Sequence, residues 1–189
     1  QVNWQKIRNR YFFGRMEVAR EDLGDKEYLL NWSVLTIIII AILLIYPSYQ
    51  NNNRERINQV VPLYATEFIH STGLNGRMFN TYGFGGYLIE QLYPDQLVFI
   101  DGRADVYGDK FLSEYLKIVE GKPGWEATFD AYQIDYVVCT RSDALRQLLM
   151  QRGDFVLVYD DDVNSVLVKD IPRYAQIIQK HRIELPTKM

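Results

Sequence analysis

One uninterrupted apolar run constrains this chain more than any other feature of its sequence. Residues 29–46 read LLNWSVLTIIIIAILLIY, with no charged residue and three polar ones. Coiled as an α-helix, this run would span roughly 27 Å, close to the hydrocarbon thickness of a bilayer. A core helix of a soluble domain this long would need a polar stripe, which the run lacks. The sequence therefore predicts a transmembrane helix over residues 29–47, ended by Pro47.

Leucine, isoleucine and valine fill twelve positions of the run, and aromatic residues lie near its two ends. These aliphatic residues supply roughly −4 to −7 kcal/mol of insertion free energy, which outweighs the cost of the three polar residues. The aromatic residues are placed where an interfacial belt is expected. The residues predicted to contact the bilayer are Leu29, Trp32, Ile37, Ile38, Ile39, Ile40, Leu44 and Tyr46.

Basic residues flank this helix unequally. The preceding residues within about twenty positions include four, and the following residues include two. They are Arg10, Arg15, Arg20 and Lys26 before the helix, and Arg54 and Arg56 after it. The bias predicts a cytoplasmic N-terminus in the plasma (inner) membrane, with the larger C-terminal part extracytoplasmic. Residues 1–28 carry an amphipathic helical pattern, typical of a helix at the cytoplasmic interface or packed on a protein partner.

After a polar linker over residues 48–59, residues 60–189 alternate between helical and strand patterns. Strands are predicted at 77–80, 97–100 and 134–140, and a closing hairpin over 155–169. Helices are predicted between them, one of them over 142–152 with Ser142 as its N-cap. The predicted fold class is α/β: a single transmembrane helix followed by one globular domain with a mixed sheet flanked by helices.

Composition excludes several classes of function. The net charge of −3 argues against a nucleic-acid partner, which would need a concentrated basic surface. One cysteine, Cys139, and two histidines leave no basis for a metal site or an internal disulfide. No Ser-His-Asp or Cys-His pattern is supported, so no catalytic residue, metal or cofactor is expected. The acidic run 160–162 is interpreted as a hairpin turn.

A glycine-rich stretch follows the first predicted strand: Asn80-Thr-Tyr-Gly-Phe-Gly-Gly-Tyr87. Gly83, Gly85 and Gly86 lie between a strand and a helix, where backbone amides can converge on an anion. The favoured alternative is that these glycines provide only positive-φ turns and close strand–helix packing.

A second stretch, Phe99-Ile-Asp-Gly-Arg-Ala-Asp-Val-Tyr-Gly108, places Asp101, Arg103 and Asp105 just past a predicted buried strand. In open α/β sheets ligands bind at this end of the strands, so these residues and Asn80 are candidates for holding a sugar hydroxyl or a phosphate. The favoured interpretation is a structural network in which the charges neutralise one another.

Taken together, these stretches resemble a bacterial pattern. It runs from FNTYGFGGYLIEQLYPDQLVFIDGRADVYGD through Trp125 and IDYVVCT to VLVYDDDVNSVLV. This order is similar to the C-terminal soluble domain, with the last transmembrane helix, of polytopic GT-C glycosyltransferase-like membrane proteins. The resemblance implies an extracytoplasmic domain. In that family the catalytic acidic residue lies in an early extracytoplasmic loop, a part for which this chain has no counterpart.

Two functions are therefore expected. The first is a non-catalytic, single-pass accessory or scaffolding subunit of a larger bacterial membrane complex, with the bilayer and other membrane-protein subunits as partners and an energy-transducing complex as one plausible host. The alternative is the terminal module of a GT-C-type glycosyltransferase, which would recognise a sugar, a glycan or a lipid-linked sugar.

Overall fold

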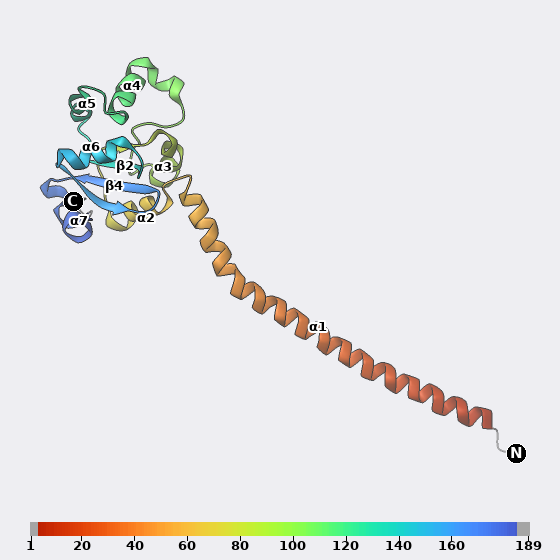
Figure 1. The fold of residues 1–189 in the computed structure, drawn as a ribbon. Helices are drawn as coiled ribbons and strands as arrows, with labels where there is room; N and C mark the ends of the chain where they lie inside the picture. The colour runs from red at the N-terminus through yellow and green to blue at the C-terminus, as the bar shows by residue number, and fades with distance from the viewer. Residues whose placement is uncertain (1–3, 185–189) are drawn as a thin grey trace. The chain divides into compact units, whose positions relative to one another are not determined.

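The computed structural model describes residues 4–184, with side chains from residue 31 onward. The chain divides into two compact units, Gln1–Asn53 and Arg54–Met189. Helix α1 (Trp4–Asn58) forms the first unit and enters the second with its last residues (Figure 1). Residues 31–58 are long and apolar enough to cross a membrane, and the most apolar part of them is not buried in the protein.

Pro47 does not end this helix, so that prediction from the sequence is wrong. Proline removes one backbone donor and crowds the preceding turn, but the helix resumes its hydrogen bonding beyond it. The backbone amide of Gln59 donates to Glu55 (3.1 Å) and that of Val61 to Ile57 (3.0 Å). The residues predicted as a polar linker are therefore helical as far as Asn58.

The second unit contains a four-stranded mixed sheet in the order β1-β2-β4-β3. Its strands are β1 (Met78–Asn80), β2 (Tyr136–Thr140), β3 (Phe155–Asp160) and β4 (Asn164–Lys169). β1 and β2 are parallel, whereas β4 is antiparallel to both β2 and β3. The sheet edges are a three-residue strand, β1, and β3, whose pairing shifts register between Leu157 and Tyr159.

Helices join the strands in the α/β arrangement that the sequence predicts. They are α2 (Leu63–Thr72), α3 (Gly85–Leu92), α4 (Ala104–Val119), α5 (Trp125–Ala131), α6 (Ala144–Arg152) and α7 (Ala175–His181), with short 3₁₀ helices η1 (Tyr82–Phe84) and η2 (Pro172–Tyr174). Asp143, rather than Ser142, immediately precedes α6 and occupies its N-cap position.

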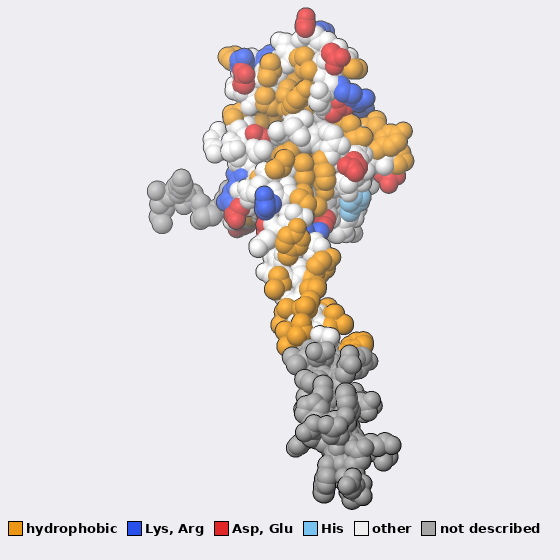
Figure 2. Space-filling view, turned by 90° about the vertical axis from the view of Figure 1, so that its right-hand side faces the viewer, with side chains coloured by type: hydrophobic (Ala, Val, Ile, Leu, Met, Phe, Trp, Pro, Cys, Tyr) orange, Lys and Arg blue, Asp and Glu red, His pale blue; other side chains and the backbone are white. Residues whose placement is uncertain are grey.

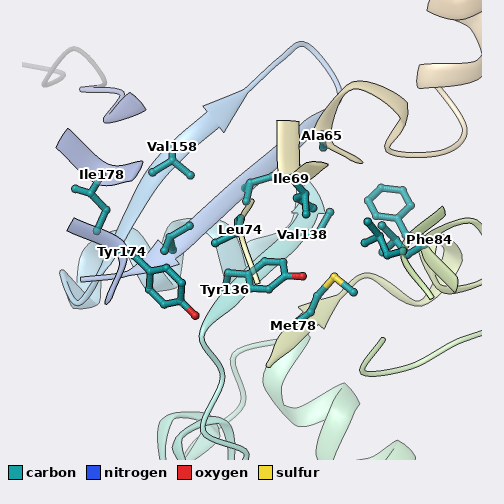
Figure 3. Close-up of a cluster of buried hydrophobic side chains, with 14 residues drawn as sticks. Ala65, Ile69, Leu74, Met78, Phe84, Tyr136, Val138, Val158, Tyr174 and Ile178 are labelled. Carbon is teal, nitrogen blue, oxygen red and sulfur yellow. The ribbon is translucent and has the colours of Figure 1, made fainter. Parts of the chain in front are cut away.

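Two hydrophobic cores lie on the two faces of the sheet, because alternate strand residues point to opposite sides. Tyr136 and Val138 belong to the core that α2, α3 and α7 cover (Figure 3). Val137 and Cys139 belong to the core under α4, α5 and α6. Burial of apolar side chains on both faces explains why β2 reads as a continuous apolar run.

The predicted strand at 97–100 is absent. These residues run beside the outer edge of β1, but no backbone hydrogen bond joins them to it within the described chain. Leu97 is 72% exposed, Val98 and Phe99 are partly buried, and Ile100 is fully buried. The apolar run LVFI is accounted for by core contacts of Val98, Phe99 and Ile100 rather than by strand pairing.

Candidate functional site

The glycine-rich turn positions the start of α3 directly against residues 100–101. A Cβ atom added at Gly85 would lie 2.2 Å from the carbonyl oxygen of Ile100 and 2.5 Å from the Cα of Asp101. A Cβ at Gly83 or Gly86 would have no neighbour within 4 Å. None of the three has a positive φ, so the predicted role in positive-φ turns is wrong and close packing at Gly85 remains.

The backbone amides of this turn already donate hydrogen bonds inside the domain. The amide of Phe84 donates to the carbonyl of Thr81 (3.0 Å), and that of Gly85 to the carbonyl of Tyr82. The amide of Tyr82 donates to the hydroxyl of Tyr115 (2.8 Å). Burial raises the pKa of Tyr115 to about 12, so this hydroxyl stays neutral. These three amides are therefore not free to converge on a phosphate.

Asn80, fully buried at the end of β1, holds residues 99–100 with its side chain. Its Nδ2 donates to the carbonyls of Ile100 (2.8 Å) and Thr81 (3.0 Å). Its Oδ1 accepts from the amides of Phe99 (2.8 Å) and Ile100 (3.3 Å). The Asn80 amide thus supplies the hydrogen bonds that a strand neighbour would otherwise supply.

Asp101 is buried and bound to Arg103 by three hydrogen bonds. Its carboxylate accepts from Nη2 (2.6 Å), Nε (3.0 Å) and the backbone amide (2.9 Å) of Arg103. The side chain of Asp101 is 3% exposed, whereas that of Arg103 is 69% exposed. The hydrogen bonds from Arg103 hold the pKa of Asp101 well below its usual range, despite the opposing effect of burial.

Asp105 is not part of this arrangement. It is exposed in the first turn of α4 and forms no hydrogen bond or ion pair within the described chain. The structure therefore brings together Asn80, Gly85, Asp101 and Arg103, and leaves Gly83, Gly86 and Asp105 outside the cluster. The four clustered residues fasten residues 99–103 to β1 and α3.

Asp101→Asn should lower the stability of the globular unit at pH 7, and the difference from the wild type should shrink as pH falls. The folded-state pKa of Asp101 lies below its unfolded value, so its charge stabilises the fold above about pH 4, and that contribution is lost as pH decreases. Thermal unfolding of both proteins between pH 7 and pH 2 measures this. A constant difference across the range would contradict it.

The acidic run 160–162 closes the β3–β4 hairpin. Oδ1 of Asp161 accepts from the amides of Val163 (2.7 Å) and Asn164 (2.6 Å), the turn geometry that the sequence indicates. Its Oδ2 accepts from Tyr159 (2.7 Å) and from Asn58 (3.0 Å), the last residue of α1. Within the described side chains no group of three metal-ligating residues lies close enough to hold an ion.

A buried ion pair escaped the sequence interpretation. Arg146 on α6 is 6% exposed and contacts Asp160 (3.1 Å) and the hydroxyl of Ser165 (2.9 Å). The sequence feature that could have indicated this burial is the position of Arg146 between Leu145 and Leu149, which are both fully buried. Nearby Cys139 is also buried, and burial raises the pKa of its thiol, as expected for a packed rather than a reactive cysteine.

Most residues predicted to contact the bilayer are exposed along α1, and Figure 2 shows hydrophobic side chains on the visible face of this helix. Their exposures range from 49% for Ile38 to 74% for Leu44. Leu29 lies outside the described side chains, as does the amphipathic pattern of residues 1–28, although the backbone is helical from Trp4.

Comparisons of the chain with protein-family models, with curated proteins and with solved structures give no match.

Proposed function

We propose that this chain is a membrane-anchored accessory subunit, whose α/β domain serves as a scaffold for other subunits of a larger bacterial membrane complex. The observation that carries the proposal is the apolar helix over residues 31–58. Its isoleucine and leucine side chains have no covering protein within the described chain, and a bilayer supplies the cover that they need.

The arrangement around Asp101 supports a structural rather than a catalytic role for the domain. The carboxylate is neutralised by Arg103, and the amide of Asn80 is occupied by backbone groups. A general base needs an accessible group with a pKa near the working pH, and Asp101 has neither property. The basic residues before the helix support an extracytoplasmic position for the domain.

The alternative is the sugar- or lipid-carrier-recognising terminal module of a GT-C-type enzyme. It rests on the resemblance of the Gly-Gly-Tyr and Asp-Gly-Arg-Ala-Asp blocks and on the exposed guanidinium of Arg103. The internal hydrogen bonds of Asp101 leave this site little capacity to bind a sugar hydroxyl. Loss of glycan binding by Arg103→Ala, with an unchanged melting temperature, would favour the alternative.

Membrane anchoring is tested by carbonate washing of vesicles that contain the full chain. The wild type should stay in the membrane pellet, whereas the double variant Ile39→Arg and Ile42→Arg should move to the wash, because arginine is unfavourable near the centre of a membrane helix. The double variant Ile39→Leu and Ile42→Leu is the matched control and should stay in the pellet. Release of the wild type into the wash would overturn the proposal.

Orientation and partners need two further measurements. Protease added to intact spheroplasts should degrade the domain, and a protected domain would contradict the extracytoplasmic placement. After gentle detergent extraction the chain should migrate with other membrane proteins on a native gel, whereas migration as a lone monomer would contradict the scaffolding role.

A further inference from the structure

A cleft of about 950 Å³ opens in the globular unit at the amino end of β1, away from the Asp101 cluster. We call it the β1 cleft; residues 73–78 and 95–99 form its two long walls. It exists because residues 97–100 do not pair with β1 as a strand: Asn80 joins the two segments only at the carboxyl end of β1. The volume lies within the range of small-molecule sites.

Apolar and aromatic residues make up about half of the cleft lining, and polar residues make up the rest. Ile69, Leu74 and Met78 belong to the core around Tyr136 (Figure 3). The aromatic residues of the lining form their own cluster: the ring of Phe99 lies 5.1 Å from that of Phe111 and 4.9 Å from that of Tyr132. This surface fits an aliphatic or aromatic body.

Leu97 can contact a bound ligand, whereas the amide of Gln96 is occupied by hydrogen bonds within the protein. Leu97 lines the cleft but is 72% exposed, so it can cover a bound ligand. The buried amide of Gln96 donates to the carbonyl of Leu74 (2.8 Å) and accepts from the hydroxyl of Tyr136 (3.0 Å). Both polar groups of the Gln96 side chain therefore have hydrogen-bond partners in the protein and need none from a ligand.

Two arginines line the cleft without carboxylate partners. Arg77 donates to the amide oxygen of Gln133 (2.8 Å) and Arg173 to that of Asn75, and neither forms an ion pair in the described chain. Both contacts are to neutral amide oxygens, so neither guanidinium is paired with a carboxylate.

Two carboxylates lie near the arginines, but neither forms an ion pair with them in the described chain. Asp135 accepts from the backbone amide of Arg77 (2.8 Å) rather than from its guanidinium. Asp95 is the one carboxylate in the described lining, and the ring of His70 lies 3.1 Å from the carbonyl of Gln91. Among the lining residues two guanidinium groups outnumber the one carboxylate, and the carboxylate of Asp135 lies just outside the lining, beside Gly76; the unpaired guanidinium groups are the groups that an anion could contact.

We propose that the β1 cleft binds an anionic amphiphile: a ligand with one phosphate or carboxylate group, held by Arg77 and Arg173, and an apolar body packed against Leu97 and Phe99. Both arginines line the cleft, where the guanidinium of Arg173 is bonded to Asn75 and that of Arg77 to Gln133. Neither the accessory role nor the Asp101 cluster requires this site.

The test uses the full chain in nanodiscs of zwitterionic lipid, titrated calorimetrically against empty nanodiscs as background. The probes are 1-naphthyl phosphate, dihexanoyl phosphatidic acid, inorganic phosphate and 1-naphthol. The first two carry both an anion and an apolar body and should bind at least about 10-fold more tightly than the last two, which each lack one of them. Stronger binding of the phosphatidic acid would assign the ligand to lipid headgroups, and stronger binding of naphthyl phosphate to soluble metabolites; either result supports the proposal.

Variants identify the residues responsible. The double variant Arg77→Gln and Arg173→Gln should weaken binding of naphthyl phosphate by about 10-fold or more, because both charge-assisted contacts are lost. Arg182→Gln is the matched control, because Arg182 is an exposed arginine outside the cleft, and it should bind as the wild type does. Leu97→Ser should weaken naphthyl phosphate and leave inorganic phosphate unchanged.

Three results would overturn the proposal. One is the absence of binding by any probe, and the second is equal affinity for 1-naphthol and 1-naphthyl phosphate. The third is unchanged affinity in the double arginine variant. Since Arg77, Arg173 and Leu97 are exposed, these variants should keep the fold, and an unchanged melting temperature verifies it.

Discussion

Gly85→Ala should destabilise the globular unit by about 3 kcal/mol, which corresponds to a melting temperature lower by roughly 10 °C. The added methyl group would overlap the carbonyl oxygen of Ile100 and the Cα of Asp101, at 2.2 and 2.5 Å. Both are backbone atoms, so no side-chain rotation can relieve the overlap. Either α3 or the segment carrying Asp101 has to move, and the hydrogen bonds of Asn80 to Ile100 resist that movement.

Gly86→Ala is the matched control for this prediction. Gly86 is the next residue of α3, and a Cβ there has no neighbour within 4 Å. Alanine at a helical position is favoured over glycine by up to about 1 kcal/mol, so this variant should be as stable as the wild type or more stable. Thermal unfolding followed by tryptophan fluorescence compares the two variants. Equal melting temperatures for both would show that the contact at Gly85 is not tight in solution.

Asn80→Ala should cost about 3 kcal/mol, the second large effect. The substitution leaves the carbonyl of Ile100 and the amides of Phe99 and Ile100 without the partner that Asn80 provides. These groups are buried or partly buried, so water replaces that partner poorly. Chemical denaturation of the full chain measures the free energy of unfolding.

The control is Asn75→Ala, at an exposed asparagine whose amide bonds to Gly73 and Arg173. Its effect should be below about 1 kcal/mol. If the two asparagine variants unfold at the same denaturant concentration, then residues 97–100 are held to the sheet by their apolar contacts, and the hydrogen bonds of Asn80 contribute little.

The α/β architecture is predictable from the sequence because the spacing of hydrophobic residues and the composition of each segment indicate whether it forms a helix or a strand. The run IDYVVCT is apolar on both faces, and the structure buries Val137 and Cys139 on one side and Tyr136 and Val138 on the other. The same reasoning fails for LVFI. An apolar run fits either a paired strand or a core-facing loop, and the choice depends on a side chain twenty positions earlier, Asn80.

The candidate site is only partly predictable for a related reason. Asp101 and Arg103 are two positions apart, so their mutual neutralisation follows from local geometry. The role of Gly85 depends on a backbone contact with Ile100, which the spacing of glycines does not reveal. The β1 cleft depends on residues from five separate segments that no local pattern connects.

The edges of the sheet affect how readily copies of the domain can aggregate. Unpaired strand edges recruit strands from neighbouring molecules and start aggregation. Here β1 is three residues long and faces the segment that Asn80 holds, while on β3 the register shift interrupts the pairing pattern and the amide of Ile183 bonds to the carbonyl of Leu157 (2.9 Å). Domains crowded together at high concentration would thus find few backbone groups through which to polymerise.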